Sequence, residues 1–382
     1  MNLLRRTLLT AAWALAFGAP ALALAQPIKI AGLFELSGAG ATSGTNFRDG
    51  FMLAVKEINA AGGILGRKIE ATAADTQSNP GVAKGLASKA VDDNVFAVFG
   101  PVFSGSVMVS MNETRRAEIP NFVGGEAAAI TKQGNAFVFR TSFTQETAMP
   151  KVARYIANGL KAKNVAVVYV NNDFGKGGRD AITKALADVG VKVVADISTD
   201  SGQIDFSAPV LRAKQANADA LFVYVNEEES ARALRELRKQ GYDKPLVGET
   251  TLTGQKVIEL AGDAANGATA HVGLTLDAPN PLMLAFKAKF YREYNYFCDH
   301  NGIKGYTGLY LLKAAIEKVG KVDRQAVSKA LHGLSVKADK HPGVILDVTI
   351  DDKGDLDRES YLVEVKGGRQ LVKEVLPALA KK

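Results

Sequence analysis

The sequence has few of the residues that enzymes and cross-linked secreted proteins use. Its 382 residues include one cysteine, Cys298, and four histidines. A single cysteine excludes a disulfide framework within the chain. No Gly-x-Ser-x-Gly elbow is present, and Cys298 lies between Phe297 and Asp299 in a helical stretch, which is typical of a buried thiol rather than a nucleophile. The histidines do not have metal-ligand spacing. They are His271, His300, His332 and His341. We therefore expect no enzyme activity and no metal.

Long runs of basic residues and long apolar runs are also missing. The net charge is +7, but no run of five or more basic residues occurs, so the charge pattern argues against nucleic-acid binding. Beyond residue 25, no apolar stretch approaches the 18 residues of a membrane span. The composition, 47% hydrophobic and 23% charged, is that of a globular protein long enough for two domains.

The first 25 residues have the pattern of a signal peptide. Arg5 and Arg6 precede an apolar stretch that contains two helix breakers, and small residues end this stretch at Ala25. The alternative is an N-terminal membrane anchor, but the stretch is short for a span and ends in a cleavage-type sequence. We expect cleavage near Ala25 and a soluble mature protein in the periplasm.

The remaining chain alternates short β-type runs with segments of helical periodicity. This alternation predicts βα units and parallel sheets, and hence a doubly wound α/β fold. In the helix expected after Thr45, for example, one apolar stripe contains Phe47, Phe51 and Ile58 and ends before Gly62. The expected strands are 28–34, 68–74, 95–100, 121–123, 165–170, 191–197, 220–225, 246–248 and 268–272.

Nine such strands exceed what one compact sheet usually holds, so we expect two lobes that divide near 140–144. Segment 281–334 is predicted to be almost wholly helical, and strand-like segments follow at 344–350 and 361–365. The lobes are expected to comprise 26–143 plus 273–344, and 144–272 plus 345–382.

Two glycine-rich segments have part of the glycine spacing of nucleotide-binding loops. Gly38, Gly40 and Gly44 follow the first strand but lack the compact G-x-G-x-x-G form, and no acidic residue ends a second strand at the expected distance. The glycines around Lys176 lack the Lys-Ser ending of a phosphate-binding loop. We expect a flexible cleft loop and no cofactor.

Segment 30–69, IAGLFELSGAGATSGTNFRDGFMLAVKEINAAGGILGRKI, resembles the opening of the periplasmic leucine/isoleucine/valine-binding proteins of ABC importers. The resemblance continues through VFGPVFSGS at 98–106, YVNNDFGKGG at 169–178, GQIDFSAPVLRAKQANADALFVY at 202–224 and ELAGDAANGA at 259–268. It implies the type I periplasmic-binding-protein fold, in which two Rossmann-like lobes joined by three crossings close over a ligand by hinge bending.

The resemblance also implies a ligand site in the first lobe. Ser104 matches a residue that holds the α-carboxylate of the ligand, and it starts a helix whose free amides suit an anion. The alternative is that Ser104 only caps this helix. The loop with Gly124 approaches the same head group in relatives, but Glu126 replaces a hydroxyl residue there. Glu126 must therefore point away, bind an amine, or indicate a different ligand.

In the second lobe, Phe174 matches a tyrosine of amino-acid binders and is expected either to close over the ligand or to belong to the core. Asn226 and Glu227 follow one strand and Glu249 follows the next, where relatives place the acid that pairs with the α-ammonium. Glu249 is the preferred partner, because Glu227 together with Glu228 and Glu229 is also explained as helix N-terminal charge.

Two further positions indicate a reshaped pocket. Ser43 stands where relatives can place a tryptophan, and Phe103 replaces a small residue. We expect a monomeric solute-binding protein that captures a branched-chain or other amino acid and delivers it to an inner-membrane ABC permease. The alternatives are a binder of another carboxylate or amide, for example an aromatic acid, and a sensory binding protein.

Overall fold

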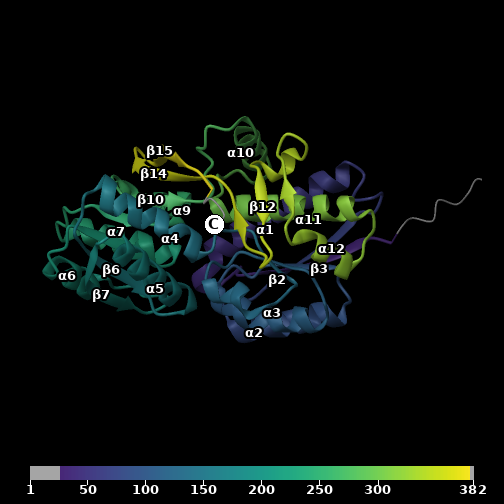
Figure 1. Cartoon of the computed structure of the whole chain (residues 1–382), viewed down its shortest axis with the longest axis horizontal. Coiled ribbons are helices and arrows are strands. Elements are labelled where there is room, and N and C mark those ends of the chain that lie inside the picture. The colour runs from purple at the N-terminus through teal and green to yellow at the C-terminus, as the bar shows by residue number, and fades with distance from the viewer. Residues whose placement is uncertain (1–25, 379–382) are drawn as a thin grey trace, which may run out of the picture.

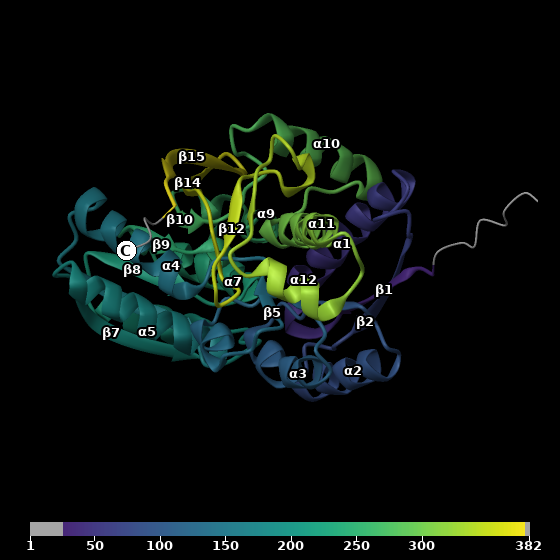
Figure 2. The same cartoon turned by 45° about the vertical axis from the view of Figure 1, so that its right-hand side comes forward.

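The computed structural model describes residues 26–378. The expected signal peptide, with cleavage near Ala25, lies outside the described residues. The chain forms two α/β lobes side by side, as Figures 1 and 2 show from two directions. This arrangement confirms the predicted fold class of two Rossmann-like lobes.

The first lobe contains a five-stranded parallel sheet in the order β2-β1-β3-β4-β5. Its strands are β1 (Ile28–Phe34), β2 (Ile69–Asp75), β3 (Ala97–Phe99), β4 (Asn121–Val123) and β5 (Val138–Arg140). Its helices are α1 (Ala41–Ala60), α2 (Pro80–Asp92), α3 (Ser104–Arg116), α10 (Pro281–Tyr294), α11 (His300–Val319) and α12 (Arg324–Leu331). The predicted stripe of α1, with Phe47, Phe51 and Ile58, is buried in the same hydrophobic core as much of α11.

The second lobe contains a seven-stranded sheet in the order β15-β14-β10-β9-β8-β6-β7. Its strands are β6 (Asn164–Val170), β7 (Lys192–Thr199), β8 (Ala220–Tyr224), β9 (Leu246–Gly248), β10 (Thr269–Val272), β14 (Ser360–Lys366) and β15 (Arg369–Leu376). Its helices are α4 (Gln145–Arg154), α5 (Asp173–Asp188), α6 (Ser207–Gln215), α7 (Glu227–Lys239), α8 (Thr250–Thr253) and α9 (Gln255–Ala261). Strands β14 and β15 run antiparallel, as expected of an edge added to a parallel sheet.

The sequence pattern missed β5 and β15. Strand β5 has only three residues, and β15 is an edge strand whose residues are mostly exposed, so neither has the apolar run of a central strand. A small third sheet, which was also not anticipated, contains β11 (Ser335–Val336), β12 (Val348–Ile350) and β13 (Leu356–Asp357).

The third crossing between the lobes was expected after residue 344. However, the Ile350 amide donates to the Leu334 carbonyl, and the Arg140 amide at the end of β5 donates to the Gly354 carbonyl. These two bonds favour a third crossing between β13 and β14, with the small sheet on the first lobe.

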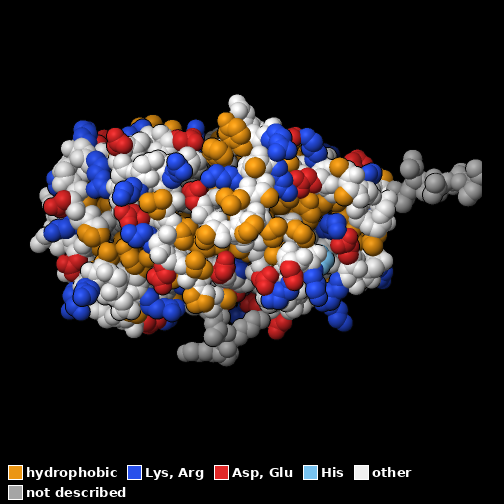
Figure 3. Space-filling model, turned by 90° about the horizontal axis from the view of Figure 1, so that it is seen from above, with side chains coloured by type: hydrophobic (Ala, Val, Ile, Leu, Met, Phe, Trp, Pro, Cys, Tyr) orange, Lys and Arg blue, Asp and Glu red, His pale blue; other side chains and the backbone are white. Residues whose placement is uncertain are grey.

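The carboxyl ends of the parallel strands in both lobes point toward the seam between them. This is where ligands bind in open α/β sheets, because the loops leave the strands there and the helices begin there. Within residues 26–378, no helix has the length and apolar character needed to cross a bilayer. On the face in Figure 3, Lys and Arg side chains are interspersed with Asp and Glu.

Candidate ligand-binding site

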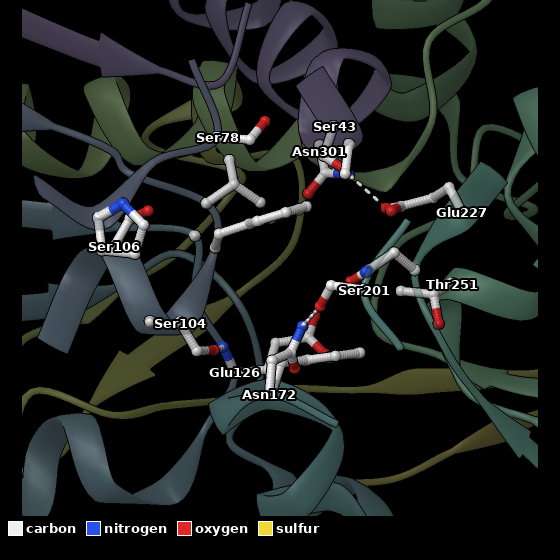
Figure 4. Close-up of a pocket in the computed structure, with 18 of the residues that line it drawn as sticks. Ser43, Ser78, Ser104, Ser106, Glu126, Asn172, Ser201, Glu227, Thr251 and Asn301 are labelled. Atoms are coloured by element: carbon white, nitrogen blue, oxygen red, sulfur yellow. Dashed lines mark hydrogen bonds between the residues drawn. The ribbon is translucent and has the colours of Figure 1, made fainter. Parts of the chain in front are cut away.

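A cavity of about 220 Å³ lies between the lobes. Most of its wall comes from loops and helix starts that directly follow β1, β3 and β4 in the first lobe and β6, β8 and β9 in the second (Figure 4). Eight of the nine residues expected at the site line this cavity. They are Ser43, Phe103, Ser104, Gly124, Glu126, Phe174, Asn226 and Glu227.

The start of α11 completes the wall with His300, Asn301 and Lys304. No local pattern in the sequence indicated these three as ligand-site residues. They lie far along the chain from every strand end of the first lobe, and only the packing of α11 against α1 brings them to the cavity. Residues Ser78, Ser201 and Thr251 were missed too, although each follows an expected strand and the strand-end rule could have found them.

Ser104 is the first residue of α3, and Phe103 occupies the N-cap position without a side-chain cap. The capping alternative for Ser104 is therefore wrong. The Ser104 Oγ instead accepts hydrogen bonds from the backbone amides of Glu126 and Ala127, at 3.3 and 3.2 Å. Since a hydroxyl that accepts two bonds still has its own proton to donate, Ser104 can donate to a ligand oxygen in the cavity.

A second hydroxyl lies two residues further along the same helical turn. Ser106 Oγ is buried and has no hydrogen-bond partner among the described residues. The first amides of α3 also lack partners within the helix, and the helix dipole is positive there. Together with Ser104, this turn offers hydrogen-bond donors to a carboxylate.

Glu35, at the end of β1, holds the loop that carries these groups. It is fully buried, and its two carboxylate oxygens accept the backbone amides of Val102 and Phe103, each at 3.0 Å. Burial raises its pKa to about 7, against the opposing effect of the two amide bonds. Glu35 therefore fixes the position at which α3 begins, a role that the sequence analysis missed.

Glu126 lines the cavity and does not point away from it. Its Oε1 forms a buried ion pair with Lys304 Nζ at 2.8 Å, and its Oε2 accepts a bond from the Tyr224 hydroxyl at 3.4 Å. Burial raises the pKa of Glu126, and Lys304 opposes this rise. The positive charge of Lys304 thus reduces the repulsion that a ligand carboxylate would otherwise meet.

Glu227 is the acidic residue of the second lobe that faces the cavity. It starts α7, is buried, and accepts a bond from Asn301 Nδ2 at 3.3 Å (Figure 4). Burial, with Asp299 and Glu228 nearby, raises its pKa to about 8. A buried carboxylate of this kind gains from any cation placed beside it. Next to it, Asn226 and Glu229 form a capping box that starts α7.

Glu249, the preferred ammonium partner in the sequence analysis, does not line this cavity. Its Oε1 lies 3.0 Å from His271 Nδ1, and its Oε2 accepts the amide of Thr250. Both Glu249 and His271 are buried in the second lobe. Glu249 also lines a small void that touches Glu126 and Lys304.

Phe174 packs against the core of the second lobe and also faces the cavity. Its ring stacks on Tyr224 with centroids 4.2 Å apart, and it also lines the cavity. The Gln145 amide holds this pair together, because it donates to the Phe174 carbonyl at 2.7 Å and to the Tyr224 hydroxyl at 3.1 Å.

Several hydrogen bonds join the lobes across the cleft, among them the backbone bond from the Gln145 amide to the Glu126 carbonyl and the bond from Lys132 to Glu146. Besides Asn301 to Glu227 and Tyr224 to Glu126, the hydroxyl of Thr42 in α1 donates to Glu228 in α7. The lobes are therefore in contact on both sides of the cavity, which is the closed arrangement expected of a two-lobed binder.

Known proteins resemble this chain along most of its length. The protein-family model described as periplasmic binding protein matches residues 27–370 of this chain. The Leucine-, isoleucine-, valine-, threonine-, and alanine-binding protein of Pseudomonas aeruginosa is 28% identical over 363 residues, with 94% of this chain and 95% of the relative covered. The Leu/Ile/Val-binding protein BraC3 of Rhizobium johnstonii is 30% identical over 337 residues, with 87% and 90% covered.

A solved structure has the same fold. The branched-chain amino acid transporter substrate binding protein of Streptococcus pneumoniae, in complex with isoleucine, superimposes with a TM-score of 0.83 at 25% identity, and the match covers 92% of this chain and 99% of that one. The two lobes, the cavity at the ends of their strands and the match along residues 27–370 lead to one conclusion: the chain belongs to the periplasmic binding protein family.

Proposed function

We propose that this protein is the solute-binding component of an ABC importer and captures an amino acid in the cavity between its lobes. In this role the mature chain, cleaved after Ala25, works in the periplasm as a monomer and delivers its ligand to an inner-membrane permease. It binds without chemical conversion. The names of the Pseudomonas and Rhizobium relatives support an amino-acid ligand.

One observation carries the proposal: donors for a carboxylate and a buried acid face each other across the same cavity. Ser104, Ser106 and the start of α3 lie on the first lobe, and Glu227 lies on the second. An amino acid has both matching charges on one carbon. A ligand that contacts both lobes stabilises the closed form over the open one, and this difference in affinity is what drives closure.

Glu227 is a better ammonium partner than Glu249 in this arrangement. Glu249 already has His271 and the Thr250 amide as partners and lies behind the cavity. Glu227 accepts a long bond from Asn301 and lies beside the Ser43 hydroxyl, but it has no cation beside it among the described residues. The carbonyl oxygen of Asn301, buried and without a partner there, can accept a second ammonium proton.

The test is a calorimetric titration of the mature protein with the twenty amino acids, each paired with its deaminated acid, and with benzoate. We expect binding of at least one amino acid and a loss of more than tenfold for its deaminated analogue. Glu227→Gln should weaken amino-acid binding by more than tenfold, because an unpaired ammonium would be left in a buried site.

Glu249→Gln is the matched control, since it removes the same charge in the neighbouring loop but outside the cavity. It should change affinity much less than Glu227→Gln. Tighter binding of benzoate or of deaminated acids than of every amino acid would overturn the amino-acid proposal. Reconstitution with the permease separates import from sensing, because a sensory protein would not stimulate transport.

A further inference from the structure

We propose that the ligand is an amino acid with a polar, uncharged side chain, whose hydroxyl or amide group hydrogen-bonds to Thr251 and His300. This inference rests on the proposed function and names the ligand class within it. It concerns the part of the cavity that the head group leaves unused.

Thr251 and His300 come to the cavity from opposite lobes. Thr251 is in α8, directly after Glu249, and His300 is the first residue of α11. Their relative exposures are only 6% and 5%. In Figure 4, Thr251 lies on the same side of the cavity as Glu227, opposite Ser104 and Ser106.

Both side chains have hydrogen-bonding capacity that the protein does not use. Thr251 Oγ1 and His300 Nδ1 are buried, and neither has a hydrogen-bond partner among residues 26–378. Ser43, Ser106 and Asn301 of the same wall also have such an atom. Buried polar groups in native proteins are nearly always satisfied, so this cluster points to partners supplied by a ligand.

The head group of an amino acid does not account for these two atoms. Its carboxylate is matched by the donors at the start of α3, and its ammonium by Glu227 and the carbonyl oxygen of Asn301. The Ser43 hydroxyl lies beside Glu227 and so belongs to the ammonium end of the site. Thr251 and His300 remain for the side chain. Bound leucine would leave both of them buried and unpaired, whereas a hydroxyl or amide can donate to one and accept from the other.

The charges around the cavity favour a neutral side chain. Lys304 is already paired with Glu126, so a second carboxylate would find no free cation in the described wall. A second ammonium would lie near Lys304 and beside an imidazole whose pKa burial and Lys304 lower well below its usual value. The rim is polar too: Asn172 Nδ2 donates to Ser201 Oγ at 3.1 Å, and Ser43 and Ser78 lie nearby in the lining.

The experiment compares ligands of nearly equal shape. The mature protein is titrated with threonine and valine, and with asparagine and leucine. In at least one pair the polar amino acid should bind at least tenfold more tightly, because a site with unpaired polar groups rejects the apolar isostere.

Three variants assign the preference to the site. Thr251→Val should reduce the ratio of polar to apolar affinity at least fivefold, mainly through weaker binding of the polar ligand, and Thr251→Ser, which retains a hydroxyl, should keep most of the ratio. Thr72→Val is the control, since Thr72 is exposed in β2, and it should leave both affinities unchanged. Melting curves confirm that each variant is folded.

The outcomes separate the two proposals. Tighter binding of leucine and valine than of asparagine and threonine would overturn this inference and leave the amino-acid function intact. An unchanged ratio in folded Thr251→Val would also overturn it. Binding of no amino acid at all would overturn both.

Discussion

Lys304 Nζ lies 2.8 Å from Glu126 Oε1, and this ion pair is buried in the wall of the ligand cavity. Both residues belong to the first lobe, but they are 178 positions apart in the sequence. Tyr224 of the second lobe donates to the other oxygen of Glu126. The pair thus provides a charge-balanced surface against which the second lobe closes.

Removing Lys304 should destabilise the protein strongly. In Lys304→Met, Glu126 would be left as an unpaired buried carboxylate, and we expect a loss of about 3–5 kcal/mol in the free energy of unfolding. Urea denaturation measures this loss. The double variant Lys304→Met/Glu126→Gln should recover much of it, because the unpaired charge is then removed as well. A single-variant loss below about 1 kcal/mol would contradict a buried, intact pair.

Ser104→Ala should weaken the binding of any carboxylate ligand by about 1.5–3 kcal/mol, the range for a hydrogen bond to a charged group. The amides of Glu126 and Ala127 would also lose their acceptor. Ser335→Ala, at an exposed position of β11 in the small sheet, is the control and should not change affinity. Equal affinities of folded Ser104→Ala and the unmutated protein would remove Ser104 from the site.

Amino-acid binding should strengthen as the pH rises from 6 to 8. The pKa of Glu227 is about 8 in the ligand-free protein, so this group is mostly protonated at pH 7. A ligand ammonium favours the carboxylate form, so binding must release the proton, and affinity should change by up to about tenfold per pH unit. Calorimetry in buffers of different ionisation enthalpy measures the released proton directly.

Glu227→Gln provides the control for this pH effect. Its weaker binding should show little pH dependence between 6 and 8, and no proton release from this site. If affinity and proton release of the unmutated protein are independent of pH in this range, no ammonium pairs with Glu227.

The ligand-free protein should lose stability as the pH rises from about 6.5 to 8. The raised pKa values of Glu35, about 7, and Glu227, about 8, mean that the folded state keeps protons that the unfolded state has already released. Stability therefore falls with pH in this window. The lowered pKa of His300 makes stability rise with pH, but only below about pH 6.5. The pKa of Lys151, lowered to about 8, has the same effect on stability mainly above pH 8.

Urea denaturation at pH 6.5 and 8 tests this prediction. The decrease should be smaller in Glu227→Gln, because that variant has no proton to release at this position. A higher stability at pH 8 than at pH 6.5 in the unmutated protein would show that these two carboxyl groups are not buried as described.

Local patterns in the sequence determined most of the fold and part of the site. Strand and helix periodicity depends on neighbouring residues, so β1 and the buried stripe of α1 could be predicted without tertiary contacts. Parallel strands present their carboxyl ends to the cleft, and residues directly after them, such as Ser104 and Glu227, could therefore be assigned to it from the sequence. Short or exposed strands such as β15 have no comparable local signal.

Only the tertiary structure decided how the side chains at the cleft are partnered. The sequence could not distinguish Glu227 from Glu249, because both follow strands of the same sheet. The packing of His271 against Glu249 distinguishes them, since it occupies one acid and leaves the other facing the cavity. The pairing of Lys304 with Glu126 likewise arises from helix packing between distant segments. Such contacts depend on long-range geometry and burial, which no local pattern of residues encodes.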